Sequence, residues 1–219
     1  MLLKDNEIKR SSGILMPIFT LPSPYGIGTL GKASRDFINF LQASNQSWWQ
    51  ILPVGPTSYG DSPYQSPSTH AGNPYFIDLD ILVEDGLLEQ SEIDALFWGD
   101  SPCLVDYGAL YENRYTLLQK VCDRGWDRDF DRIEAFKSAN SYWLLDYALF
   151  MALKRHFNML SWLEWPDEDI RLRKPEAIKF YTEKLADDIR LFTYIQFLFF
   201  NQWNALREYA HEHSVGIIG

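Results

Sequence analysis

Residues 55–68 form the stretch of this 219-residue sequence whose side chains are best suited to chemistry with a ligand. They combine small turn-forming residues and hydroxyls with the carboxylate of Asp61 and the amide of Gln65. Two tyrosines, Tyr59 and Tyr64, add flat aromatic faces. Sugars need such a set, because their ring faces pack on aromatic surfaces and their hydroxyls take paired donors and acceptors. The stretch therefore predicts a sugar-binding loop, and the alternative is a rigid Pro- and Gly-rich loop that only shapes the surface.

Two further acidic residues, Asp78 and Asp80, are candidates for catalysis. Their spacing would put both carboxylates on one face of a strand, and a carboxylate pair is what glycoside chemistry uses. The alternative is that they cap turns or bind backbone amides, as acidic residues near strand ends commonly do. The acidic run 167–169 is expected to be a solvated loop.

The histidines and cysteines do not predict a metal site. His211 and His213 form an H-x-H pair at the expected end of a helix, where cations are favourable, and a metal would need further ligands. Cys103 and Cys122 lack a metal or redox spacing and are expected to be reduced structural thiols. The sequence also lacks a phosphate-binding loop and a dinucleotide fingerprint, so no catalytic constellation stands out.

The apolar pattern predicts the elements that position the loop. Residues 13–19 predict a buried strand that ends or bulges at Pro17, and residues 32–43 predict an amphipathic helix. Residues 48–54 predict a second strand, which completes a βαβ unit with parallel strands. The long loop 55–75 then leaves the carboxyl end of that strand, where parallel-sheet enzymes place their active sites.

The remainder of the chain is predicted to be mainly helical. A helical texture runs from about residue 86 to 162, and residues 143–151 follow helical spacing. Pro175 suits the first turn of another helix, which is expected to continue with few breaks to about His211. Residues 215–219 predict a short third strand. Three parallel strands cannot close a barrel, which needs eight, so the sequence is expected to be truncated.

The composition argues against several classes of partner. With 20 Lys and Arg against 30 Asp and Glu, the net charge is −10, which would repel nucleic acids and anionic membranes. No signal-peptide core and no run of about 20 apolar residues occurs, so a cytoplasmic protein is expected. Aromatic residues make up 16% of the chain, which predicts either a rich core or rings that face sugars.

Several segments together resemble those of one enzyme family. In one-letter form the central ones read SWWQILPVGPT (47–57), GDSPYQS (60–66) and AGNPY (71–75). The other matching segments are 12–14, 21–28, 105–107, 147–154 and 217–219, with Gln196, Gln202 and Trp203. Over essentially the whole chain, the sequence resembles the 4-α-glucanotransferases (amylomaltase or disproportionating enzyme, glycoside hydrolase family 77).

The resemblance implies an α/β fold: the N-terminal part of a (β/α)8 TIM barrel with a helical inserted subdomain, the barrel being incomplete in this chain. Residues 1–85 are expected to hold the first barrel strands with the substrate loop 55–75. Residues 86–175 are expected to form the mainly helical inserted subdomain. Residues 176–219 are expected to form a long helix that returns to the barrel and the start of the next strand.

The resemblance also implies an activity. The family transfers a segment of an α-1,4-glucan, such as a maltooligosaccharide, maltodextrin, starch or glycogen, to the 4-hydroxyl of an acceptor glucan or glucose. It uses a retaining mechanism and no cofactor. Retaining chemistry needs a nucleophilic carboxylate and an acid/base carboxyl group about 5–5.5 Å apart. The family carries both on later barrel strands, so catalytic residues are expected beyond residue 219 and the chain alone is expected to be inactive.

What the resemblance assigns to this chain is substrate binding. By motif match, Tyr64 resembles the tyrosine that stacks on the sugar beside the cleaved bond. Asp61 and Ser62 are expected to orient the loop or meet sugar hydroxyls, with a loop-capping role as the alternative for Asp61, and Gln65 is a further contact. Tyr59 resembles an aromatic residue of an accessory glucan-binding groove. Two other functions stay open: a non-catalytic glucan-binding module, and a hydrolase of the related α-amylase superfamily, which shares the barrel and the stacking tyrosine.

Overall fold

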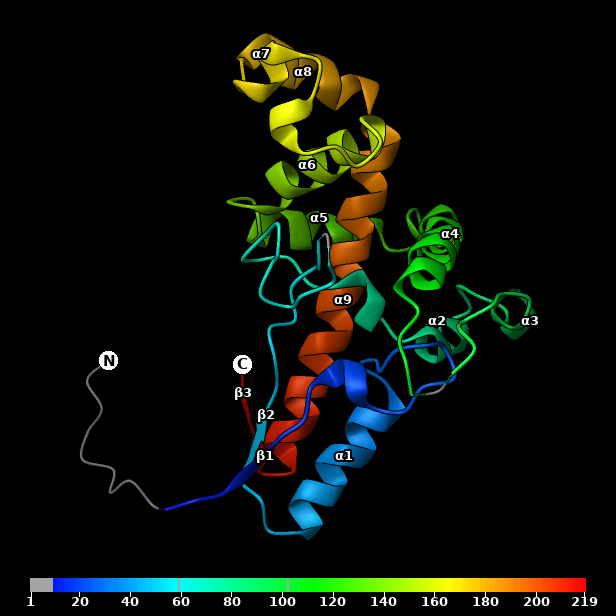
Figure 1. Cartoon of the computed structure of the whole chain (residues 1–219), viewed down its shortest axis with the longest axis vertical. Coiled ribbons are helices and arrows are strands. Elements are labelled where there is room, and N and C mark those ends of the chain that lie inside the picture. The colour runs from blue at the N-terminus through cyan, green and yellow to red at the C-terminus, as the bar shows by residue number, and fades with distance from the viewer. Residues whose placement is uncertain (1–9, 59, 102) are drawn as a thin grey trace.

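The computed structural model describes residues 10–58, 60–101 and 103–219, and arranges most of its helices along one long helix (Figure 1). The strands are β1 (Gly13–Leu15), β2 (Trp48–Gln50) and β3 (Gly216–Ile218). The helices are α1 (Lys32–Ala43), α2 (Leu79–Glu84), α3 (Gln90–Asp94), α4 (Tyr107–Gly125), α5 (Phe130–Ala139), α6 (Leu144–His156), α7 (Glu168–Arg171), α8 (Pro175–Lys184) and α9 (Ala186–Glu212). Short 3-10 turns lie at Ile18–Thr20, Pro74–Phe76 and Trp162–Glu164.

The three strands form one parallel sheet in the order β1-β2-β3. The predicted βαβ unit is therefore confirmed, and the predicted third strand pairs with β2. Only the first residues of the predicted strand 13–19 are in the sheet, because the chain leaves the strand before Pro17 and enters a 3-10 turn. Pro17 has no backbone N–H to give to a ladder, which is why a strand ends there readily.

Helix α1 covers one face of the sheet and has the bounds predicted from its apolar spacing. The Trp49 side chain of β2 is fully buried, and its ring centroid lies 5.1 Å from that of Phe37 on α1. The indole N–H of Trp49 donates to the carbonyl oxygen of Met16 at 2.7 Å. This contact ties α1 to the strands.

Helix α9 is the long helix that runs along the length of the molecule (Figure 1). It contacts α4, α5, α6 and α8 along its upper part, and α1 and β3 near the sheet. The helix predicted from Pro175 to about His211 with few breaks is present with one break, because α8 and α9 are separate helices that meet at Leu185. Leu185 is buried with non-helical dihedral angles, and no Pro or Gly marks the break. Tertiary packing overrides local propensity at this residue.

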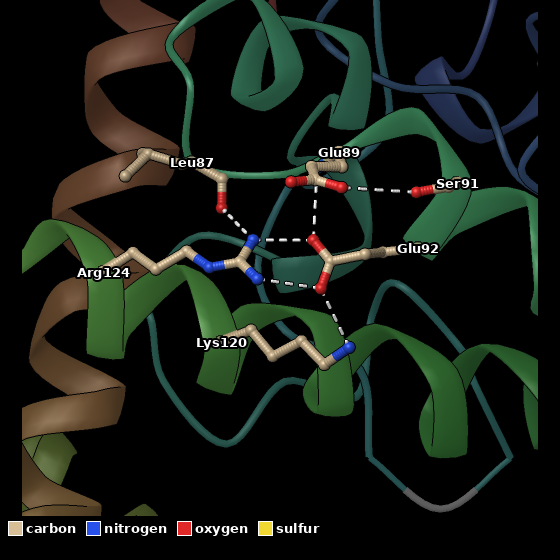
Figure 2. A network of polar contacts seen from close by, with 6 residues as sticks. All are labelled: Leu87, Glu89, Ser91, Glu92, Lys120 and Arg124. Carbon is tan, nitrogen blue, oxygen red and sulfur yellow. Dashed lines mark hydrogen bonds and ion pairs between the residues drawn. The ribbon is translucent and has the colours of Figure 1, made fainter.

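The carboxylate of Glu92 joins α3 to α4 (Figure 2). Arg124 on α4 donates two hydrogen bonds to Glu92, at 2.6 and 2.9 Å, and Lys120 donates a third at 3.0 Å. The oxygen Oε2, which accepts the 2.6 Å bond from Arg124, also accepts from the backbone N–H of Glu89 at 3.1 Å. These bonds fix the short helix α3 against the longer one.

The acidic residues cap or begin helices, as the capping alternative for Asp78 and Asp80 states, so the strand hypothesis for this pair and the loop expected at 167–169 are wrong. Asp78 and Asp80 do not share a face of a strand, because Asp78 is the N-cap of α2 and its Oδ1 accepts from the backbone N–H of Ile81 at 3.1 Å. Asp80 lies in the first turn of α2, where an acidic side chain suits the helix dipole. The acidic run 167–169 is not a free loop either, since Asp167 caps α7 and accepts from the backbone N–H of Asp169 at 2.9 Å.

Candidate functional site

The loop 55–75 and helix α9 enclose a groove of about 550 Å³. One wall consists of loop and strand-end residues, and the other consists of aromatic side chains of α9. Tyr64 stands at this groove with 73% of its surface exposed. The lining residues are Pro53, Val54, Gly55, Pro63, Tyr64, Ser66, Ser68, Thr69, His70, Ala71, Gly72, Phe199, Phe200 and Trp203.

Hydroxyl groups of the loop hold its own backbone. The Ser58 hydroxyl donates to the carbonyl oxygen of Gln65 at 2.8 Å, and the Ser62 hydroxyl accepts from the backbone N–H of Tyr64 at 3.3 Å. The Ser68 hydroxyl accepts from the backbone N–H groups of His70 and Ala71, at 3.2 and 3.1 Å. Such side-chain turns fix a loop that has no regular secondary structure. Of the predicted contacts, Ser62 thus holds the backbone at Tyr64.

Asp61 lies at a different cavity from Tyr64. It lines a small space of about 30 Å³ together with Thr57, Asn73 and Tyr107, and Pro63 lines both cavities. Burial raises the pKa of Asp61, and a hydrogen bond with Thr57 opposes that rise. Burial and the nearby carboxylate of Asp61 together raise the pKa of Tyr107. Asp61 therefore lines a small cavity next to the groove, and Pro53 also lines both.

The structure describes Gln65, and it does not describe Tyr59. Gln65 is exposed, and its backbone rather than its side chain carries the bond to Ser58. Tyr59 lies outside the described residues. Asp61 itself has a positive φ of 52° and follows Gly60 with a φ of 86°, so the backbone turns sharply just before the segment that carries Tyr64.

Aromatic side chains outside the loop complete the groove. Phe200 and Trp203 are three positions apart on α9 and line it from the helix side. At the far end, the His70 ring lies 5.3 Å from that of Tyr142, which is 71% exposed, and 6.0 Å from that of Trp143. The sequence predicts that Phe200 and Trp203 lie on a helix, but it does not predict that this helix packs against the loop.

The groove has the chemistry of a sugar-binding surface. It offers exposed aromatic faces with hydroxyl, imidazole and backbone groups beside them, the combination that flat, hydroxyl-rich rings require. None of the described residues that line it is an aspartate or glutamate. The arrangement can hold and orient a saccharide, and it supplies no carboxylate pair at this position to cleave one.

Metal chemistry and membrane insertion have no visible basis in the described ranges. Across residues 10–58, 60–101 and 103–219, no three His, Cys, Asp or Glu side chains gather to hold a metal ion. The predicted histidine pair ends α9, with His211 in the last turn and His213 as the C-cap. Within the same ranges, no helix is long and apolar enough to cross a membrane.

Comparisons with known sequences point to one family. The family model described as 4-alpha-glucanotransferase (glycoside hydrolase family 77) matches residues 16–219. The 4-alpha-glucanotransferase of Streptococcus pneumoniae is 47% identical over 212 residues, which cover 96% of this chain and 42% of that protein. The 4-alpha-glucanotransferase of Thermus thermophilus is 40% identical over 217 residues, which cover 97% of this chain and 42% of that protein.

A solved structure agrees with the sequence comparisons. Amylomaltase from Streptococcus agalactiae, in complex with acarbose, superposes with a TM-score of 0.94 at 39% identity, covering 96% of this chain and 43% of that one. The predicted α/β fold class, part of a barrel with helical additions, is thereby confirmed. The chain spans less than half the length of these relatives.

Proposed function

The chain belongs to the 4-α-glucanotransferase family, glycoside hydrolase family 77, and from this we propose that it forms the substrate-binding N-terminal part of such an enzyme. The enzyme would transfer a segment of an α-1,4-glucan to the 4-hydroxyl of an acceptor glucan or of glucose. The observation that carries this proposal is the groove between the loop and α9, where Tyr64 presents an exposed ring beside Phe200 and Trp203.

The proposed division of labour separates binding from bond cleavage. Tyr64 stacks on a sugar ring beside the cleaved bond, and Ser62 supports Tyr64 through the hydrogen bond to its backbone N–H. Gln65 extends the contact surface, and Asp61 holds the loop from the side of the small cavity. Tyr59 serves an accessory glucan-binding groove away from the active centre. The carboxylate pair of a retaining mechanism belongs to the part of the family that this chain does not span.

The proposed substrates are α-1,4-glucans: maltooligosaccharides, maltodextrin, starch or glycogen. They are uncharged, so a protein with a net charge of −10 does not repel them. We place the protein in the cytoplasm, in keeping with two cysteines that form no disulfide within the described residues. We also propose three structural parts, residues 1–85, 86–175 and 176–219, of which the middle one is the helical insertion.

Maltotriose distinguishes the proposed activity from its rivals. A full-length family enzyme that carries this chain should convert maltotriose into glucose and longer maltooligosaccharides, because transfer conserves the number of glycosidic bonds. A hydrolase would yield short sugars alone, and a non-catalytic glucan-binding module would leave maltotriose unchanged. Chromatography of the products, with reducing ends counted over time, separates these outcomes. A rise in total reducing ends without longer products would overturn the transferase proposal.

A further inference from the structure

Two buried glutamines of α9 each hold one backbone residue at or just after the end of the loop 55–75, a contact that we call a grip. Gln196 accepts a hydrogen bond from the backbone N–H of Gly72 at 2.8 Å, and its Nε2 donates to the carbonyl oxygen of Gly72 at 3.0 Å. Further along the helix, Gln202 makes the same pair of bonds with the N–H and C=O of Asp78, at 2.7 and 3.1 Å. Both amides are buried.

The two grips are chemically equivalent. A primary amide carries a donor and an acceptor side by side, so it matches the N–H and C=O groups of a single backbone residue. Buried backbone groups need a partner, because water does not reach them to replace a lost one. Removing either the Gln196 or the Gln202 amide therefore costs the fold a similar pair of hydrogen bonds.

The two grips differ in what they position. Gly72 lines the groove, and the next residue, Asn73, donates its backbone N–H to the carbonyl oxygen of Val54 at 2.8 Å. That bond joins the exit of the loop to its entrance, so Gln196 holds both ends of the loop against α9. Asp78 instead caps α2, so Gln202 holds the start of a helix.

The contact at Gly72 also sets the spacing of the two groove walls. A Cβ atom added to Gly72 would lie 2.0 Å from Cδ1 of Phe199, so the loop backbone rests directly on the helix. Phe200 and Trp203 follow on the same helix and line the groove. The amide of Gln196 thus fixes the loop wall relative to the aromatic wall.

We propose that Gln196 is a positioning residue for glucan binding. Its amide locks the exit of the loop onto α9, so that Tyr64 and Trp203 line a single groove of constant width. The proposal rests on the proposed function of that groove. It predicts that losing the Gln196 amide weakens glucan binding by more than its effect on stability explains, since a small displacement of binding groups is costly.

The matched comparison is Gln196→Met against Gln202→Met in the full chain. Maltoheptaose binding is followed by tryptophan fluorescence, since Trp203 lines the groove, and by calorimetry, well below each variant's unfolding midpoint. Both variants should lower the midpoint to a similar extent. Gln196→Met should weaken binding by about tenfold or more, whereas Gln202→Met should stay within about threefold of the unchanged chain. Gln196→Asn, which keeps the amide but is one methylene shorter and so reaches less far toward Gly72, is the second variant if Gln196→Met does not fold.

A Tyr64→Ala variant measured alongside separates two kinds of failure. If Tyr64→Ala weakens binding but the Gln196 and Gln202 variants lose affinity equally, Gln196 is only structural and the inference is overturned. If the unchanged chain does not bind maltoheptaose, or Tyr64→Ala binds it as well as before, the groove is not the glucan site. The proposed function of the groove then fails, and the inference fails with it.

Discussion

Tyr64 is the side chain on which the proposed glucan contact depends most. It combines a ring that is 73% exposed with a backbone N–H held by the Ser62 hydroxyl, so the ring is presented from an ordered turn. A loop backbone that is ordered before the ligand arrives loses little conformational freedom on binding. The contribution of Tyr64 should therefore appear as binding energy rather than as stability.

In the full-length enzyme, Tyr64→Ala should reduce transition-state stabilisation by about 1–3 kcal/mol, the scale of a lost aromatic packing contact. The measurement is kcat/KM for maltotriose disproportionation. Phe180→Ala is the matched control, because Phe180 is an exposed aromatic residue on α8, away from the groove. If Tyr64→Ala keeps the kcat/KM of the unchanged enzyme, Tyr64 does not belong to the site.

At the scale of elements, the ion-paired carboxylate of Glu92 between α3 and α4 makes the free energy of unfolding depend on pH (Figure 2). Hydrogen bonds from Arg124, and then from Lys120, lower the pKa of Glu92 to about 2. In an unfolded chain a glutamate has a pKa of about 4.3, so between these two values the unfolded state binds more protons. The stability that Glu92 contributes is therefore fully present above about pH 4.5 and is lost as the pH falls toward 2.

Glu92→Gln should lower the unfolding midpoint at pH 7, and the gap from the unchanged chain should shrink as the pH falls from 4.5 toward 2. Thermal unfolding followed by circular dichroism at a series of pH values checks this. Glu134→Gln is the control, because Glu134 pairs with Lys137 on the surface of α5 and joins no two elements. Such surface pairs contribute little. A gap between Glu92→Gln and the unchanged chain that stays constant with pH would contradict the assignment.

The elements also show what sequence patterns can and cannot predict. The helix 32–43 and the parallel strands follow from local apolar spacing, which is why their prediction is confirmed. The break at Leu185 has no local signal, because it depends on how α8 and α9 pack in the folded chain. Asp78 is the N-cap of a short helix, and alternation alone does not distinguish that position from a strand.

The candidate site divides in the same way. Tyr64 and Ser62 could be selected from the sequence, because the loop concentrates turn formers, hydroxyls and rings in one segment. Phe200 and Trp203 could not, since a helical pattern does not state which loop the helix will face. The sharp turn just before the segment that carries Tyr64 depends on the positive φ angles at Gly60 and Asp61, which composition only hints at.

At the scale of the whole molecule, one helix connects every part that the proposed function needs. Helix α9 packs against α4, α5, α6 and α8, lines the groove, holds the loop through Gln196, and ends beside the sheet where β3 joins β2. A barrel places its substrate loops at the carboxyl ends of its strands. Here the loop follows the carboxyl end of β2, and α9 holds it there through Gln196. The chain is therefore organised to present a binding surface.

Binding without turnover is the expected behaviour of the purified 219-residue chain. The described groove residues include no aspartate or glutamate, whereas retaining transfer needs a nucleophilic carboxylate and an acid/base partner about 5–5.5 Å apart. Incubation with maltotriose should yield neither glucose nor longer products by chromatography, while maltoheptaose still binds in a calorimeter. The full-length enzyme at equal concentration is the positive control. Turnover by the chain alone would place catalytic carboxylates within it, and loss of that turnover in Asp61→Asn would identify Asp61 as one of them.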